Sequence, residues 1–318
     1  MASHADALDE VARADVGTVR RHEPLAEHAT WRIGGPADLW VEPHAVKHVA
    51  NFVRTVERTG VPYVVVGYGS NLLFDDAGLR GAVLALGRNL AAFRIDGTRI
   101  WSQAGIAMPR LARAVGRAGL TGMEHTVGVP GTLGGLVAMN GGSLRRAIGE
   151  VVRSVTVVTA AGEIEAYAQA ACEFAYRHSR FQESRDIIVE ATLDMEQGDA
   201  EVIRRHMLEI LRSRRAKFPR REPNCGSVFV SGGEMYDRFG PPGKVVEETA
   251  CKGWREGAAM VSPKHANFIV NTGGASSADV LALIRRVREA VHARTGLWLV
   301  CEVKYVDPSG RVAPAHAG

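Results

Sequence analysis

The chain has 318 residues, enough for two or three compact units at the usual ~100–200 residues per domain. A net charge of +4 is mild and suits anionic small molecules, whereas a nucleic-acid binder usually concentrates its basic residues. The chain has no signal-peptide pattern and no apolar run near the ~20 residues of a membrane helix. We therefore expect a cytoplasmic protein with no membrane or nucleic-acid partner.

The first third of the chain predicts a small α/β unit. After a polar lead (1–29), residues 38–42 predict a strand. Valines from Val46 to Val56 then recur at helical spacing, and Gly60 is placed to end that helix. Residues 63–66 form an apolar, β-branched run that ends directly in glycine, which is typical of a buried strand feeding a loop. Residues 82–85 predict a further strand.

The rest of the chain predicts two more mixed units. We expect a helix over 109–119, a long glycine-rich loop over 128–142, and strands at 155–158 and 187–189. Met207, Ile210 and Leu211 mark one face of a helix whose basic run, from Arg204 to Lys217, is most simply a solvated face. A last helix runs from the Ser277 region to Gly296, a strand covers 297–305, and residues 307–318 predict a frayed tail.

The four cysteines are far apart and form no C-x-x-C pair. This spacing argues against a disulfide scaffold or a zinc site and fits a reducing compartment. Cys225 is interpreted as a small buried residue and not as a reactive thiolate.

Two glycine-rich segments could hold an extended ligand. In the loop Gly67-Tyr68-Gly69-Ser70-Asn71-Leu72, backbone N–H groups can point at phosphate oxygens. This loop differs from the Rossmann fingerprint because no third glycine and no helix follow it. The second segment holds Gly128, Pro130, Gly131, Gly134, Gly135 and Asn140. Two such loops on α/β units predict one dinucleotide held between them.

Several polar residues are candidates for chemistry, each with a plain structural alternative. Ser227 follows Gly226 among apolar residues, and the residues alone favour a turn hydroxyl. Glu302 shares a face with Trp298 and Val300 by alternation, so an edge position and a functional one are equally favoured. Arg177 is the type of residue that binds a carboxylate or phosphate in bidentate fashion, although a surface arginine is commoner. For His265 and Asn267, structural hydrogen bonding is favoured.

Seven segments, in this order, resemble the UDP-N-acetylenolpyruvoylglucosamine reductase family over about residues 30–306. They are 30–37, 67–72, 128–135 with Met139 and Asn140, Tyr176-Arg177 with Ser179, Gly226-Ser227 with Phe229, 264–271, and Glu302-Val303.

The resemblance implies an α+β fold, with a two-part FAD-binding module of the vanillyl-alcohol-oxidase type and a C-terminal α/β substrate-binding domain. The implied segments are a lead at 1–29, FAD-binding subdomains at 30–90 and 91–200, a substrate domain at 201–306 and a tail at 307–318. It also implies non-covalent FAD, NADPH as co-substrate, a UDP-sugar substrate and a monomer.

The resemblance further implies the roles of particular residues. Ser227 is the proton donor, and Arg177 and Glu302 polarise the substrate carboxylate and stabilise the intermediate. The FAD contacts are the two glycine segments given above, 67–72 and the six residues between Gly128 and Asn140. Substrate contacts are assigned to Tyr176, Lys217, Lys264, His265 and Asn267.

The chain departs from the family pattern at three places. It is short between Phe181 and Ile187, as in the subgroup that lacks a tyrosine-bearing insertion, and Tyr68 stands where glycine is common. An extension over 230–239 adjoins Ser227. Three alternatives remain: a paralogue acting on another enolpyruvyl or unsaturated acid, a flavin oxidase, or a non-catalytic flavin-binding module. The loop offers no His or Cys to tether flavin, and the presence of Arg177, Ser227 and Glu302 favours catalysis.

Overall fold

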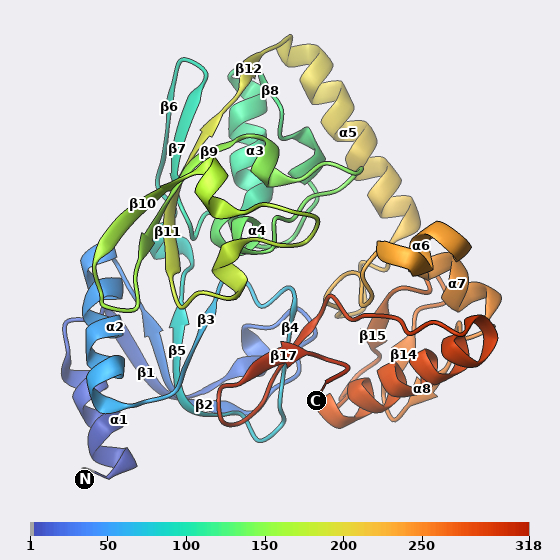
Figure 1. Cartoon of the computed structure of the whole chain (residues 1–318), viewed down its shortest axis with the longest axis horizontal. Coiled ribbons are helices and arrows are strands. Elements are labelled where there is room, and N and C mark those ends of the chain that lie inside the picture. The colour runs from blue at the N-terminus through green and yellow to red at the C-terminus, as the bar shows by residue number, and fades with distance from the viewer. Residues whose placement is uncertain (1–2, 318) are drawn as a thin grey trace. The chain divides into compact units, whose positions relative to one another are not determined.

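The computed structural model describes residues 3–317, which form two units of the chain. The first unit contains residues up to Arg21, Leu39–Tyr68 and Ala82–Arg214, and the second contains His22–Asp38, Gly69–Gly81 and Arg215–Gly318. Each unit has its own hydrophobic core, and the elements are labelled in Figure 1.

A mixed sheet and two helices begin the fold. The sheet has the order β1-β2-β5-β3, with β1 (Thr18–Pro24), β2 (Pro36–Glu42), β5 (Leu79–Ala85) and β3 (Tyr63–Val66). The strand β3 runs parallel to β5, with Tyr63 opposite Ala82. The helix α2 (Val46–Thr59) ends at Gly60, which has a φ of 71° and whose N–H bonds to the Val56 carbonyl, as predicted.

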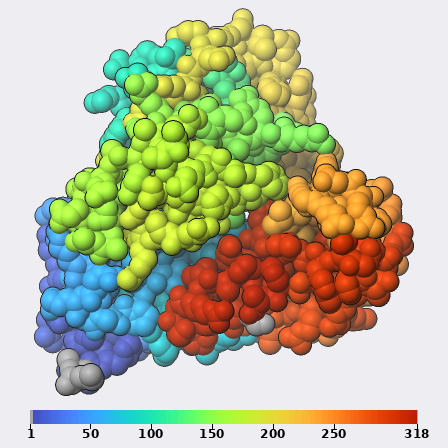
Figure 2. Space-filling model, in the orientation of Figure 1, coloured from blue at the N-terminus to red at the C-terminus, as the bar shows by residue number. Residues whose placement is uncertain are grey.

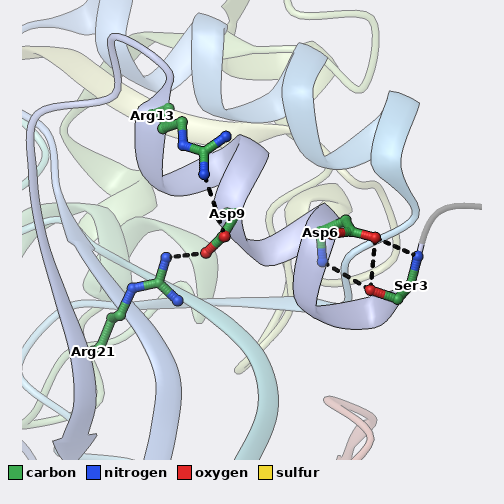
Figure 3. Close-up of polar contacts among 5 residues, drawn as sticks. All are labelled: Ser3, Asp6, Asp9, Arg13 and Arg21. Atoms are coloured by element: carbon green, nitrogen blue, oxygen red, sulfur yellow. Dashed lines mark hydrogen bonds and ion pairs between the residues drawn. The ribbon is translucent and has the colours of Figure 1, made fainter.

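The polar lead, for which the sequence predicted no element, contains a helix and a strand. It forms α1 (His4–Arg13), in which Leu8 and Val11 are buried in the cluster that also contains Val49 and Phe52 of α2. Ser3 and Asp6 form a capping box, with the Ser3 hydroxyl accepting from the Asp6 N–H at 3.2 Å (Figure 3). Asp9 bonds both Arg13 and Arg21, and so joins the helix to β1. A narrow apolar stripe is enough to anchor an otherwise charged helix.

The first unit also contains an antiparallel sheet of five strands. Its order is β10 (Ile164–Ala168), β9 (Val152–Val158), β11 (Ile187–Asp194), β7 (Arg99–Gln103) and β6 (Phe93–Asp96). The helices of this region are α3 (Met108–Arg117), α4 (Leu133–Ala138) and most of α5 (Ala200–Lys217), and β8 (Leu120–Thr121) pairs with β12 (Glu196–Gln197). The predicted inward residues Met207 and Ile210 are buried.

The second unit has two small sheets and three helices. One sheet is β13 (Arg255–Glu256), β14 (Ala259–Val261) and β15 (Ile269–Asn271); the other is β17 (Val312–Pro314), β16 (Lys304–Val306) and β4 (Leu72–Phe74). The helices are α6 (Gly233–Phe239), α7 (Pro242–Glu248) and α8 (Ser277–Thr295). Figure 2 shows the orange atoms of α6 and α7 at the surface beside the red atoms of the C-terminal part of the chain. As predicted, α8 buries Val280, Leu283, Val287 and Val291 and ends at Gly296.

Two predictions for the C-terminal part are wrong. The strand expected over 297–305 forms only at 304–306, although burial still alternates: Leu299 and Val303 are buried whereas Trp298 and Val300 are exposed. The expected frayed tail instead adds β17 to β16 and buries Ala315. Residues 298–303 therefore alternate in burial as a strand does. They form no continuous ladder, because their backbone hydrogen bonds go to loop residues such as Val228 and Val230.

Candidate active site

The loop between Gly67 and Leu72 connects β3 directly to β4, without an intervening helix. This connection confirms the prediction that it is not a Rossmann turn. Gly69 has a φ of 56°, and a Cβ atom there would lie 2.3 Å from the His28 carbonyl oxygen. A Cβ atom on Gly67 would lie 2.4 Å from Thr132 Oγ1. Only glycine satisfies both positions. The Tyr68 side chain is 39% exposed.

Thr30 is a candidate site residue to which the sequence interpretation gave no role. Its backbone N–H donates to the Gly69 carbonyl at 3.3 Å, whereas its hydroxyl is buried and has no hydrogen-bond partner among residues 3–317. The next residue, Trp31, is fully buried and donates from Nε1 to the Ile269 carbonyl at 2.8 Å, which fixes the segment. A buried hydroxyl without a partner is costly unless a ligand satisfies it. The sequence signal was a small hydroxyl residue between Ala29 and Trp31, both of which are buried.

Glu302 is held by backbone hydrogen bonds on two sides. Its N–H donates to the Val228 carbonyl at 2.8 Å, and its carbonyl accepts from Asn71 Nδ2 at 3.1 Å. The Asn71 carbonyl in turn accepts from the Lys304 N–H at 3.1 Å, in the parallel pair of β4 and β16. Because Ser227 directly precedes Val228, the second unit brings Asn71, Ser227 and Glu302 together. Ser227 is half-buried.

A buried amide fixes the segment that carries Ser227. Asn267 accepts from the Phe229 N–H and donates to the Phe229 carbonyl, both at 2.9 Å. His265 accepts from the Asn267 N–H at 3.3 Å and contacts the ring of Phe218. Burial lowers the pKa of His265, and the charge of Lys252 lowers it further. Both residues therefore have the structural role that the residues alone favoured, and their substrate contacts remain a prediction.

The cysteine of this segment is structural, as predicted. Cys225 is buried, and burial followed by the nearby charge of Glu302 raises the pKa of its thiol well above the ordinary value. All four cysteines are unbridged.

The second glycine segment is not the continuous loop that we expected. It contains α4, whose first N–H groups are capped by Thr132: its Oγ1 accepts from the Gly135 N–H at 3.3 Å. A Cβ atom on Gly134 would lie 2.9 Å from the Ala104 Cβ, and one on Gly141 would lie 2.6 Å from Leu136 Cδ1. Close packing within the chain therefore explains these two glycines.

Among the predicted cofactor contacts of this segment, Pro130 and Gly135 are exposed and Gly131 has a φ of 133°. A Cβ atom on Gly128 would lie 2.5 Å from the Arg214 side chain. Asn140 is buried and its amide is used by the protein itself, because Nδ2 donates to the Ala175 carbonyl at 2.7 Å.

Arg177 lies in the first unit, at the end of a tight turn. Its φ is 56°, and the turn is closed by Ala175 and His178, which exchange backbone hydrogen bonds at 3.1 Å. Arg177 Nη2 donates to the Gly142 carbonyl at 3.3 Å, and the guanidinium lies 5.3 Å from the centre of the exposed Tyr176 ring. These contacts hold the side chain against the segment that follows α4. Ser227 and Glu302 belong to the other unit.

The two lysines assigned to the substrate lie near the end of α5. Lys217 is exposed, and its charge is among those that lower the pKa of His265. Lys264 Nζ donates to the Arg215 carbonyl at 2.9 Å, so it also neutralises the carbonyl end of the helix.

His125 is a buried titratable residue that the sequence interpretation did not single out. Both ring nitrogens lack a hydrogen-bond partner within the described part of the chain. Burial, followed by the charge of Arg146, lowers the pKa of His125 to about 4. Since the imidazole is neutral in the folded protein and protonates near pH 6.5 when unfolded, its contribution to stability is complete above that pH and is lost as the pH falls toward 4.

We expect His125→Leu to flatten the acid side of the stability profile. Between pH 7 and pH 4.5 the wild type should lose about 2–3 kcal/mol through this one group, and the variant should not. Urea unfolding at both pH values measures the difference. His44→Leu, which removes an exposed histidine, is the control; equal pH dependence of wild type and His125→Leu would contradict the assignment.

Comparison with known proteins identifies the family. The family described as "UDP-N-acetylenolpyruvoylglucosamine reductase, C-terminal domain" matches residues 218–306, and "FAD binding domain" matches residues 37–167. The UDP-N-acetylenolpyruvoylglucosamine reductase 1 of Corynebacterium glutamicum is 45% identical over 292 residues, covering 92% of this chain and 87% of the relative. The chain belongs to the UDP-N-acetylenolpyruvoylglucosamine reductase family.

Other members of the family agree. The reductase of Heliobacterium modesticaldum is 42% identical over 308 residues, covering 95% of each chain. The crystal structure of the Thermus caldophilus reductase superposes with a TM-score of 0.77 at 31% identity, covering 92% of this chain and 98% of that one. The α+β fold, with an FAD binding domain followed by the reductase C-terminal domain, is therefore shown.

The residues present fit FAD. At Gly67 and Gly69 a Cβ would collide with the chain itself, so only glycine lets this loop pack as it does. The buried Thr30 hydroxyl beside Gly69 has no partner among residues 3–317, and such a free donor fits an anionic group such as a pyrophosphate. Across residues 3–317, no helix has the length and apolar character needed to span a membrane.

Proposed function

We propose that Ser227, Glu302 and Arg177 are the residues with which this reductase acts. The reaction is reduction of the enolpyruvyl ether of UDP-N-acetylglucosamine to UDP-N-acetylmuramate with NADPH, a step of peptidoglycan precursor synthesis. The observation that carries the assignment is the hydrogen-bonded pairing of the Ser227 and Glu302 segments inside the matched C-terminal domain. When bound, FAD would supply the chemistry of hydride transfer from NADPH to the vinyl carbon remote from the carboxylate.

Ser227 protonates the carbon next to the substrate carboxylate. Hydride addition leaves negative charge on that carbon, delocalised into the carboxylate. The segment of Ser227 is held by the Asn267 amide on one side and by the Glu302 N–H on the other, so the hydroxyl is presented by a rigid backbone. A serine hydroxyl is a weak acid and needs a neighbour that replaces its proton.

Glu302 is that neighbour. By alternation it shares a face with Trp298 and Val300, and its backbone N–H bonds to the Val228 carbonyl, next to Ser227. An ionised carboxylate alone would repel the developing charge, so in this proposal Glu302 takes up a proton before the step and passes that proton to Ser227.

Arg177 polarises the substrate carboxylate. The guanidinium stays charged and offers several donors in a planar fork that matches a carboxylate. Loss of one donor to a developing oxyanion costs ~2.7–4 kcal/mol in comparable sites. The bond to the Gly142 carbonyl restricts the rotamers of the side chain and prepares it for that contact.

The remaining assignments follow from the same family pattern. We propose FAD contacts at Thr30, at 67–72 and within 128–140, and substrate contacts at Tyr176, Lys217 and Lys264. The proposed segments are 30–90 and 91–200 for FAD and 201–306 for the substrate. The enzyme belongs to the subgroup with the short connection before Ile187 and works as a cytoplasmic monomer.

A second candidate is a paralogue for another enolpyruvyl or unsaturated acid. The extension after Ser227 favours it, because these residues fold as α6, with Met235 buried in the core that also contains Cys225 and Val228. A structured element so near the proton donor can change the shape of the substrate cavity.

One experiment tests the function and separates the two candidates. The flavin-loaded protein is reduced with NADPH without oxygen and then mixed with UDP-N-acetylglucosamine enolpyruvate, while flavin absorbance is followed. We expect rapid reoxidation. A protein that remains colourless with added FAD would contradict the flavoenzyme assignment, whereas a yellow protein unaffected by this substrate would favour the paralogue.

A further inference from the structure

An unusual group of cations lies at the end of α5 and in the loop after it. No acidic residue occurs between Glu209 and Glu222. Five cations of this stretch have no ion-pair partner among residues 3–317, and they are Arg212, Arg215, Lys217, Arg220 and Arg221. In the second unit Arg286 and Arg294 are paired with glutamates, whereas Arg285 and Arg311 are exposed and have no ion pair among residues 3–317. The stretch after Glu209 differs from these single cations because its cations follow one another closely. The stretch therefore carries uncompensated positive charge.

The helix end explains only part of this charge. Cations in the last turn of a helix interact favourably with its dipole, which accounts for Arg215 and Lys217. Arg220 and Arg221 lie beyond the helix, where that effect has fallen away, and both are exposed. Two adjacent unpaired arginines repel each other in the absence of an anion.

The loop that carries these two arginines is fixed at its start. Phe218 stacks on Phe268, with ring centres 5.0 Å apart and planes 23° apart, and it also contacts His265. The following residue, Pro219, is buried. The backbone of Arg220 and Arg221 therefore begins at a residue that is fixed by packing.

The loop is also fixed at its end, by the side chain of Asn224. Its Nδ2 donates to the carbonyls of Glu222 at 2.9 Å and Pro219 at 3.3 Å, and its Oδ1 accepts from the Gly226 N–H at 3.0 Å. The same amide therefore joins the arginine loop to the residue before Ser227. Backbone fixed in this way lowers the entropy cost of using the arginines to bind a ligand.

We infer that Arg220 and Arg221 bind the 2′-phosphate of NADPH and set the preference of the enzyme for NADPH over NADH. The inference rests on the proposed function, in which NADPH and the UDP-sugar use the site in turn. Both ligands carry a pyrophosphate, and we place it at Lys217, which was proposed above as a substrate contact. Only NADPH carries a further phosphate monoester, of charge about −1.5 to −2 at neutral pH. The arginines beyond Lys217 match that additional dianion, and arginine binds phosphate in bidentate fashion.

The position of the loop is compatible with this role. Arg220 precedes Ser227 by seven residues (227 − 220), which span at most about 24 Å of extended chain. This upper limit keeps Arg220 in the same part of the second unit as Ser227, as the proposed role requires.

The test uses the flavin-loaded double variant Arg220→Ser/Arg221→Ser in the half-reaction with nicotinamide nucleotide alone. We expect the apparent Kd for NADPH to rise about tenfold or more, as for loss of a charge-assisted hydrogen bond. The apparent Kd for NADH and the limiting rate of flavin reduction should change less than twofold.

Binding of 2′,5′-ADP should weaken, whereas binding of 5′-ADP should not. Increasing salt should reduce the NADPH preference of the wild type but not that of the variant.

The control variant is Arg204→Ser/Arg205→Ser, which removes the same charge from the exposed face of α5 nearer its start. It should behave as the wild type. Unchanged NADPH binding in the first variant, or an equal loss for NADPH and NADH, would overturn the inference. A rise confined to the KM of the UDP-sugar would assign the arginines to that substrate instead. A wild type that does not oxidise NADPH would contradict the proposed function itself, so the two failures are distinct.

Discussion

Ser227→Ala is expected to stop turnover while leaving reduction of the flavin by NADPH unchanged. Nucleotide oxidation needs no proton from Ser227, whereas the carbon next to the substrate carboxylate must be protonated before product forms. General-acid catalysis contributes about 10²–10⁴-fold, so turnover should fall by at least that factor. Stopped-flow absorbance resolves the two half-reactions separately.

The control for this variant is Ser231→Ala, four residues further along the same segment. It should retain both half-reactions, because Ser231 lies outside the pairing with Glu302. If Ser227→Ala slowed both half-reactions equally, the residue would have a structural role and the proton-donor assignment would be wrong. Circular dichroism and flavin content establish that the variant is folded and loaded.

Glu302→Gln is expected to be almost as damaging as Glu302→Ala in the half-reaction with the UDP-sugar. Glutamine keeps the shape and a hydrogen-bond donor but cannot release a proton, so a relay role predicts that both variants lose about 10²–10⁴-fold. The backbone bonds of Glu302 to Val228 and Asn71 do not involve its side chain, so the segment should keep its place.

The same measurement discriminates between roles for Glu302. A glutamine variant with near-normal rates would show that the residue acts only as a neutral hydrogen-bond donor. Glu289→Gln, on the exposed surface of α8, removes an equivalent charge and should leave both half-reactions unchanged. The pH dependence of the wild-type oxidative rate should also lose its carboxyl limb in Glu302→Gln.

Elements with clear start and stop signals could be predicted from the sequence. The helices α2 and α8 both end at glycines in the left-handed region, Gly60 and Gly296, because glycine adopts that conformation at no steric cost. The strand β3 could also be predicted from its apolar run. The loop after it could be predicted from Gly67 and Gly69.

The errors have a common physical cause, which is tertiary context. Glycine has a low helix propensity, yet α4 forms over Gly134 and Gly135 because Thr132 caps it and Gly134 packs closely on Ala104. Trp298 to Val303 alternates like a strand but bonds to loops. Such partners are remote in sequence and leave no local signal.

The candidate site was predictable residue by residue only through the family resemblance. Local patterns favoured a turn hydroxyl for Ser227 and gave equal weight to two roles of Glu302. The structure adds their adjacency, which depends on the bond from Glu302 to Val228. It also adds Thr30, whose role depends on Gly69, 39 positions away (69 − 30).

The pairing of β4 with β16 joins the loop after β3 to residues near the C-terminus. Leu72 lies opposite Lys304, and Asn71 bonds to the Glu302 carbonyl, across more than two hundred positions. During synthesis on the ribosome, the loop that we propose for the FAD pyrophosphate therefore lacks its supporting strand until the last part of the chain has emerged. On that proposal, binding of the flavin is a late, post-translational event, and chains truncated before β16 lack the strand that supports the loop.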